Sequence, residues 1–100
     1  MTYEIHLYVG SVHITEKLIH RYPVGEKHAF LFYLKELENS EYEPDKAADM
    51  IAKFGYDNIE FSRAGKLDPE KLRSEEKEEY YQNALKTGST FILYKDPILT

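Results

Sequence analysis

The sequence predicts one α+β domain spanning residues 1–100, with the element order β-β-α-α-β-α-β and a four-stranded mixed sheet whose helices pack mainly on one face. Apolar and polar residues alternate in two segments, which is typical of strands, and two other segments combine helix-capping signals with apolar residues at three- and four-residue spacings. A chain of 100 residues supports one hydrophobic core. Its composition, 42% hydrophobic and 31% charged, indicates a folded protein because disordered chains have fewer apolar side chains.

The N-terminal segment 2–19 alternates as expected for a β-hairpin whose turn is Gly10-Ser11. Glycine at the first turn position favours a type II′ turn, and the turn fixes which residues face each other across the two strands. One face of this hairpin is then almost wholly apolar. A short helix in the second half of the segment is an alternative, so the sequence leaves residues 15–22 open between strand and helix.

The hairpin register also predicts the surroundings of several titratable side chains. His6 and His13 fall on the solvent-facing side as diagonal neighbours, and two imidazoles without further ligands are too few for a zinc site. Glu16 falls on the apolar side, where we expect it to lie at the margin of the sheet with its carboxylate reaching solvent; burial against a tyrosine would instead make it the best single candidate for proton transfer. His20 and His28 are isolated in the sequence and are expected to be exposed. The sequence assigns no functional role to these side chains.

The next segment, 26–37, is predicted to be a core-packing helix. Its apolar residues Phe30, Leu34 and Leu37 recur at helical spacing, and neighbouring aromatic residues broaden the stripe. A stripe of this width is typical of a helix that packs on a sheet. The segment is therefore expected to contribute to the core and to bind no cofactor.

A second helix is predicted to begin after Asp45, which follows a proline and serves as the N-cap, and to end at Gly55 in the C′ position. The following segment, 57–65, alternates between apolar and polar residues and is predicted to be a strand.

The last helix and the last strand have clear boundary signals. Asp68 as N-cap and Pro69 at the first helical position predict a helix that continues to about residue 87, where Gly88 ends it. Segment 89–97 is a nearly continuous apolar run, which predicts a strand buried on both faces near the middle of the sheet. The intervening helix has the length of a right-handed crossover, so this strand is expected to lie parallel to the preceding one.

Several classes of function lack support in the sequence. Without cysteine there is no disulfide, thiolate metal site or cysteine nucleophile, and no serine lies in a nucleophile elbow. The glycine and lysine of segment 63–67 lack the spacing of a phosphate-binding loop. We therefore expect no catalytic residues, no metal and no cofactor. The net charge of −5 argues against direct nucleic-acid binding, and the lack of a long apolar run predicts a cytoplasmic protein without a membrane partner.

Acidic residues are concentrated in two stretches, 36–49 and 68–79, and nine tyrosines are present. Tyr42 lies within the first stretch, and an aromatic side chain surrounded by carboxylates suits the surface of a basic protein. The predicted partner-binding residues combine both stretches and are Glu36, Glu38, Glu41, Tyr42, Glu43, Asp45, Asp49, Glu75, Glu78 and Glu79.

These observations favour a non-enzymatic binding module that docks on a basic protein. By analogy of class, it would be an inhibitor or immunity-type protein of bacterial or phage origin, whose negative surface competes for a nuclease site built to hold phosphate. One alternative is a small-ligand-binding protein or small enzyme with a cleft lined by tyrosine and histidine. Another is a homodimer, or a larger homo-oligomer, that assembles through an exposed strand edge.

Overall fold

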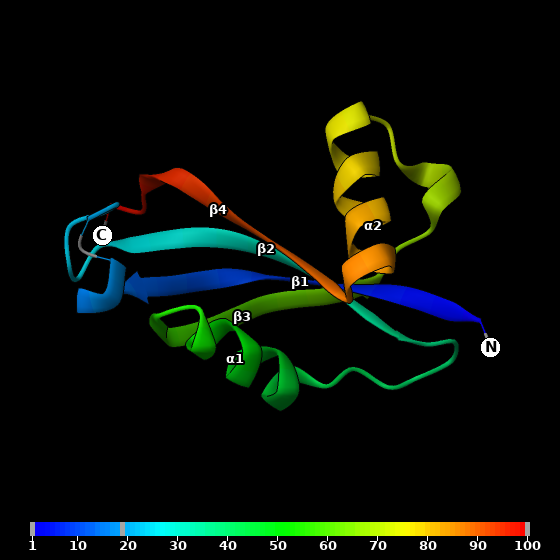
Figure 1. The fold of residues 1–100 in the computed structure, drawn as a ribbon, viewed down its shortest axis with the longest axis horizontal. Helices are drawn as coiled ribbons and strands as arrows, with labels where there is room; N and C mark the ends of the chain where they lie inside the picture. The colour runs from blue at the N-terminus through cyan, green and yellow to red at the C-terminus, as the bar shows by residue number, and fades with distance from the viewer. Residues whose placement is uncertain (1, 19, 100) are drawn as a thin grey trace.

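In the computed structural model, which describes residues 2–18 and 20–99, the chain forms one four-stranded sheet with helices beside it (Figure 1). This confirms the predicted α+β class and the single four-stranded sheet. The sheet order is β3-β1-β2-β4, and all neighbouring strands are antiparallel. The elements are β1 (Tyr3–Ile14), the 3₁₀ helix η1 (Glu16–Leu18), β2 (Lys27–Leu37), α1 (Pro44–Lys53), β3 (Tyr56–Lys66), the 3₁₀ helix η2 (Pro69–Lys71), α2 (Glu75–Thr87) and β4 (Ser89–Pro97).

The predicted turn at Gly10-Ser11 is wrong, because β1 continues through both residues as one long strand. Gly10 lies opposite Phe30 of β2 on one side and opposite Phe61 of β3 on the other. A Cβ atom on Gly10 would lie 1.9 Å from the carbonyl oxygen of Glu60, at a position where the pairing of β1 with β3 shifts register. The glycine is therefore required by close approach of a neighbouring strand instead of by a turn.

The predicted helix over 26–37 is also wrong, since this segment forms β2. Phe30 and Phe32 are buried in the cluster that includes α1, whereas Tyr33 is buried in the cluster that includes α2. Because β2 is covered on both faces, its apolar residues do not alternate with polar ones. A short continuous apolar run of this kind has no period that separates a buried strand from a helix.

The connection between β1 and β2 contains η1, so neither a long second strand nor a helix over the whole of 15–22 is present in the described part of that segment. The backbone N–H of Ile14 donates to the carbonyl of Glu26, and that of Gly25 donates to the carbonyl of Ile14, which closes the connection. Glu16 is exposed in η1 instead of facing the apolar side. This placement removes its candidacy as a buried proton-transfer group.

Helix α1 occurs where it was predicted, with one difference at its start. Glu43, and not Asp45, occupies the N-cap position and makes no side-chain capping bond. Pro44 therefore stands at the first helical position, where its fixed φ is favourable. Gly55 follows the helix with a φ of +106°, so the predicted C′ glycine is confirmed.

The predicted capping by Asp68 is confirmed, but the helix that it starts is short. The Asp68 carboxylate accepts a hydrogen bond from the backbone N–H of Glu70 (3.0 Å) at the start of η2. Helix α2 begins separately after Ser74, whose hydroxyl accepts from the N–H of Lys77 (3.1 Å), and it ends at Gly88 with a φ of +105°. Two capping residues thus divide the predicted helix into two elements.

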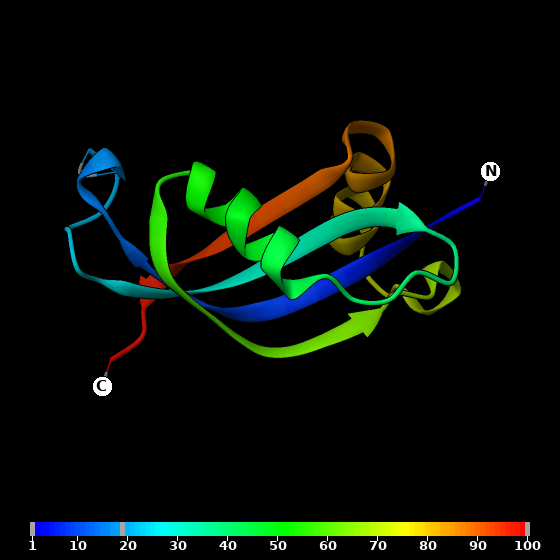
Figure 2. The same cartoon turned by 90° about the horizontal axis from the view of Figure 1, so that it is seen from below.

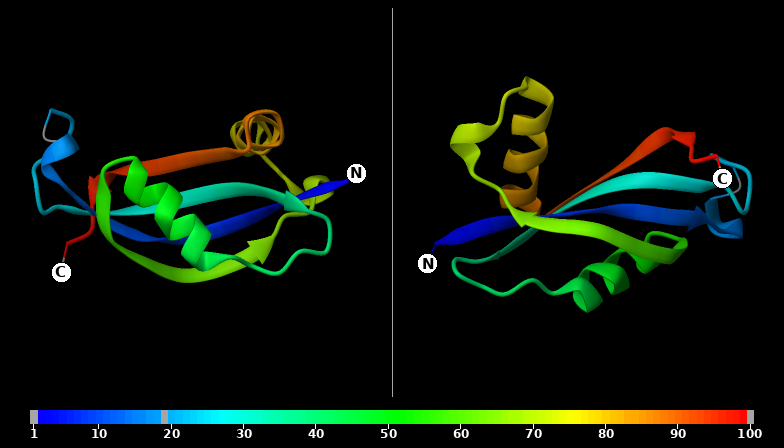
Figure 3. Two further views of the ribbon diagram at one scale, coloured as in Figure 1. Left: turned by 60° about the horizontal axis from the view of Figure 1, so that its bottom comes forward. Right: turned by 180° about the vertical axis from the view of Figure 1, so that it is seen from behind.

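The two helices lie on opposite faces of the sheet, which corrects the expectation that helices pack mainly on one face (Figures 1 and 3). We call these the α1 face and the α2 face. The α1 face holds the larger cluster, formed by Tyr8, Val12, Phe30, Phe32, Leu34, Ala47 and Ile51. The α2 face holds Ile5, Tyr33, Tyr81 and Ala84. Among the described residues, no helix is long and apolar enough to cross a membrane.

The strand β4 occurs where it was predicted, but it lies at an edge of the sheet and runs antiparallel to β2, not parallel to β3 (Figure 2). The mixed sheet and the right-handed crossover are therefore wrong. Four of the residues of β4, Phe91 to Tyr94, are partly buried or exposed, because one side of an edge strand has no neighbouring strand. The edges formed by β3 and β4 leave β1 and β2 in the centre.

Candidate functional site

The connection between β2 and α1 carries Tyr42 across the α1 face. The Tyr42 ring meets the His6 ring edge-on, with centroids 5.0 Å apart, and the Tyr8 ring at 6.3 Å. Its side chain nevertheless remains 42% exposed. Tyr42 is therefore an aromatic residue that is held from below by two buried rings and offers its other side to solvent.

Hydrogen bonds from β1 hold the backbone of this connection in place. The N–H of Glu43 donates to the hydroxyl oxygen of Tyr8 (2.7 Å), and the N–H of Asn39 donates to the carboxylate of Glu4 (2.8 Å). Asn39 has a φ of +67°, which asparagine adopts more readily than most residues. The conformation around Tyr42 is thus fixed before any partner arrives, which lowers the entropy lost on binding.

Beneath Tyr42, a charged cluster is formed by Glu4, His6 and Lys66. The Glu4 carboxylate lies 2.5 Å from Nε2 of His6 and 3.1 Å from Nζ of Lys66. The bond to His6, followed by the bond from the Asn39 N–H, lowers the pKa of Glu4 to about 2. Nδ1 of His6 has no hydrogen-bond partner among the described residues. Glu4 is therefore charged at neutral pH and orients both His6 and the connection above it.

The predicted exposure of His6 and His28 is wrong, because both side chains are fully buried. His6 lies on a central strand under Tyr42, and His28 bonds through Nδ1 to the carbonyl of Tyr94 (2.8 Å) and through Nε2 to Glu26 (3.1 Å). Only His13 and His20 keep access to solvent, and His13 interacts with the side chain of Asn58 (2.8 Å). The described residues contain no cluster of three His, Asp or Glu side chains arranged to hold a metal ion.

The carboxylates of the first acidic stretch divide into paired and available groups. Glu36 and Glu43 both bind Nζ of Lys46, at 3.0 and 3.5 Å, and Glu38 accepts a hydrogen bond from the Thr2 hydroxyl. A hydrogen bond with Glu36 and the charge of Lys46 lower the pKa of Glu43. Three exposed carboxylates of this stretch make neither an ion pair nor a side-chain hydrogen bond with the described residues, namely Glu41, Asp45 and Asp49.

The structure brings together only part of the predicted partner-binding set. The residues on the α1 side, which we call the acidic surface, are Glu36, Glu38, Glu41, Tyr42, Glu43, Asp45 and Asp49. Glu75, Glu78 and Glu79 belong to α2 and lie on the other side of the sheet (Figure 3). The two acidic stretches therefore form two separate surfaces, and Tyr42 belongs to the first.

Sequence reasoning missed the residues that support Tyr42, namely Glu4, His6 and Tyr8. It missed them because a turn at Gly10 would leave β1 in a two-stranded hairpin, with these side chains in solvent. The usable signal was the unbroken alternation of residues 3–9, which also fits a central strand covered by a distant segment. The presence of that covering segment is a tertiary property.

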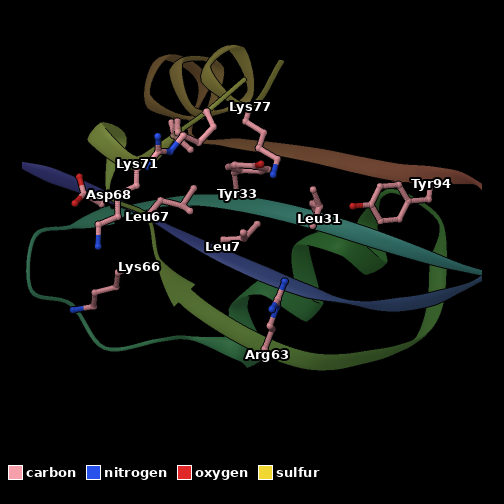
Figure 4. Close-up of a pocket in the computed structure, with 12 residues that line it drawn as sticks. Leu7, Leu31, Tyr33, Arg63, Lys66, Leu67, Asp68, Lys71, Lys77 and Tyr94 are labelled. Atoms are coloured by element: carbon pink, nitrogen blue, oxygen red, sulfur yellow. The ribbon is translucent and has the colours of Figure 1, made fainter. Parts of the chain in front are cut away.

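The expected cleft lined by tyrosine and histidine has a different composition in the structure. A cavity of about 450 Å³ on the α2 face contains Tyr33 and Tyr94, whereas the histidines lie elsewhere (Figure 4). Comparison with known proteins gives no match to any protein-family model, curated protein or solved structure. The function must therefore be argued from the geometry and charge of the chain itself.

Proposed function

We propose that this protein is a non-enzymatic binding module that docks on a basic protein through the acidic surface, with Tyr42 as the central anchor. The observation that carries the proposal is the placement of Tyr42, which is 42% exposed yet fixed against His6 and Tyr8 and flanked by Glu41 and Glu43. Tyrosine and arginine are enriched among the residues that dominate binding energy at interfaces. A rigid tyrosine ringed by carboxylates suits a partner surface rich in lysine and arginine.

The charge distribution supports an electrostatic mode of association. Glu41, Asp45 and Asp49 are exposed and have no ion-pair partner among the described residues, so their attraction is available to a ligand. The glutamates of α2 lie on the opposite side of the sheet, so they cannot contact the same partner surface as the acidic surface does. In this proposal they contribute long-range attraction. Binding should be fast at low salt and weaken as ionic strength rises.

The class of partner that we propose is a basic, nuclease-like enzyme in the cytoplasm. A carboxylate-rich surface presents negative charge at the positions where such an enzyme holds phosphate, so docking would block the substrate site sterically and electrostatically. The protein would then act as an inhibitor or immunity-type protein of bacterial or phage origin, and catalysis by this chain is not required.

The test compares three forms of the protein in pull-downs from lysate of the source cell. The forms are the unchanged protein, the double variant E41K/D49K on the acidic surface and the control E75K/E79K on α2. The unchanged protein and the control should capture one basic protein that is released at about 0.5 M salt, where the Debye length is only a few ångströms. The E41K/D49K variant should capture none of it.

The inhibitory step is tested with the captured protein after purification. Its nuclease activity should fall to zero when one equivalent of the unchanged protein is added, and should be unaffected by E41K/D49K. Equal capture by all three forms would contradict the assignment of the acidic surface, and a captured partner whose activity persists in the complex would contradict the inhibitor class.

A further inference from the structure

The α2 face contains a cavity that the acidic surface does not explain. Its volume is about 450 Å³, within the usual size range of small-molecule sites. Its floor is the sheet, represented by Leu7, Leu31 and Tyr33, and its wall is the connection from β3 through η2 to α2 (Figure 4). We call it the basic pocket, for the side chains that surround it.

Cations dominate the rim of the basic pocket in a protein whose net charge is −5. The rim carries Arg63, Lys66, Lys71, Arg73 and Lys77, and Asp68 is the one carboxylate that the described residues place there. The Asp68 carboxylate is bound to the backbone N–H of Glu70, as the cap of η2.

The positive charge of the rim is largely uncompensated. Lys66 is paired with Glu4 (3.1 Å), but the other four cations make no ion pair with the described residues. Like charges gathered around one hollow repel each other, so an anion seated there would gain the attraction of the whole group. The chemistry of the rim therefore selects a ligand with more than one negative charge.

An independent observation comes from the floor. Tyr33 is only 2% exposed, yet its hydroxyl makes no hydrogen bond within the described residues. Figure 4 shows this hydroxyl directed across the floor toward Tyr94, with Leu31 between them. Burial raises the pKa of Tyr33, so the hydroxyl keeps its proton and is able to donate to an anionic oxygen. The Tyr33 hydroxyl is not among the enclosed unpaired atoms of the described residues, so it is reached from the cavity, where a ligand oxygen would take the place of solvent.

We propose that the basic pocket binds a small aromatic organic phosphate of the size of a nucleoside monophosphate. The phosphate would be held by Lys71, Arg73 and Lys77, because guanidinium and ammonium groups bind its oxygens with charge-assisted hydrogen bonds. The flat apolar body would lie on Leu7 and Leu31 and meet Tyr94. A phosphate ester fits better than a carboxylate because it carries a second charge for a rim with several cations.

The surrounding charges also limit the size of the ligand. Glu75, Glu78 and Glu79 are exposed on the first turns of α2, immediately after the rim residue Arg73. A long polyanion that entered the basic pocket would pass these carboxylates and be repelled, whereas a mononucleotide would not extend that far. The proposal is therefore a small-molecule site and is independent of the partner proposed for the acidic surface.

The experiment is isothermal titration calorimetry of the full chain with AMP and UMP, with adenosine and inorganic phosphate as partial ligands. A nucleotide should bind at least about tenfold more tightly than either part alone. The variant R73A/K77A should lower the affinity at least about tenfold, and the control K86A, at the far end of the same helix, should leave it unchanged. The variant E41K/D49K should bind nucleotide as the unchanged protein does.

A second variant distinguishes loss of nucleotide binding from loss of folding. Tyr33→Phe removes a hydroxyl that has no partner among the described residues, so its melting temperature should be unchanged or higher while nucleotide affinity falls several-fold. Three results would overturn the proposal: no binding of AMP or UMP up to about 5 mM, equal binding by R73A/K77A, or tighter binding of a short oligonucleotide than of either mononucleotide. The last of these would assign the surface to a nucleic-acid strand.

Discussion

The two faces of the sheet are built from the same strands but differ in how completely they are covered. On the α1 face, seven fully or almost fully buried residues form a closed cluster, and carboxylates gather around one anchored tyrosine at its margin. On the α2 face, the buried cluster is smaller, and the space left beside it is a cavity with five cations on its rim. An acidic protein therefore carries a basic hollow, and the net charge alone describes neither face.

The difference arises from where the helices sit on the strands. Helix α1 lies along the sheet, whereas α2 projects away from the sheet near one end of the strands (Figures 1 and 3). A helix that follows the sheet buries an apolar stripe along its length. A helix that stands away contacts the sheet near its C-terminal end through Ala84 and Tyr81, and leaves its N-terminal end open above the strands.

The largest expected effect comes from a substitution that disturbs both faces together. Gly10→Ala would place a Cβ atom 1.9 Å from the Glu60 carbonyl oxygen, and backbone on backbone has little room to relax. We expect the free energy of unfolding to fall by more than about 3 kcal/mol in urea denaturation. The control is Gly65→Ala, where a Cβ atom would meet no atom within 4 Å. That variant should gain up to about 1 kcal/mol, and equal losses in both would contradict the close approach at Gly10.

The next largest effect is also on the free energy of unfolding, and it should differ between the α1 face and the α2 face. Ile51→Ala in α1 removes a fully buried side chain from the larger cluster, and should cost about 2–5 kcal/mol of unfolding free energy. Leu85→Ala in α2 removes a side chain that is only partly buried, so it should cost less. Urea denaturation of both variants measures the difference. A larger loss for the α2 variant would show that the α2 face is the better packed of the two.

Tyr42→Ala should affect binding far more than stability. It removes edge contacts with His6 and Tyr8, and such aromatic pairs contribute about 0.5–1.5 kcal/mol each. Thermal unfolding should therefore change modestly, while capture of the basic partner is lost. Tyr94→Ala, a similarly exposed tyrosine on β4, is the control and should keep partner binding. Loss of folding in Tyr42→Ala would make this residue structural instead of an anchor.

The smallest effect concerns the pH dependence of the free energy of unfolding, to which Glu4 contributes at the margin of the α1 face. The folded pKa of Glu4, about 2, lies below its ordinary value of 4.5. Its contribution to stability is therefore complete above pH 4.5 and is lost as the pH falls toward 2. In Glu4→Gln, the free energy of unfolding should change less steeply with pH across this acid range. The exposed control Glu41→Gln should keep the slope of the unchanged protein. Identical slopes for both variants in urea denaturation at stepped pH would contradict the charged role of Glu4.

Local chemistry was sufficient to predict the boundaries that depend on a few adjacent residues. Gly55 and Gly88 adopt positive φ at helix ends, and Asp68 caps the element that follows it. Each of these signals depends on backbone sterics or on one hydrogen bond within three residues, so it does not require a distant partner. The strand over 57–65 was predicted for a similar reason, because one of its faces is more exposed and its alternation is visible.

Only the tertiary structure decided which strands are neighbours, which face each helix covers and what surrounds each charged residue. β2 was mistaken for a helix because burial on both faces removes the two-residue period from its sequence. Gly10 was mistaken for a turn because its requirement comes from Glu60, fifty residues later in the chain. Likewise, Tyr42 and the basic pocket are each assembled from segments far apart in sequence, and contacts between such segments leave no pattern in either segment alone.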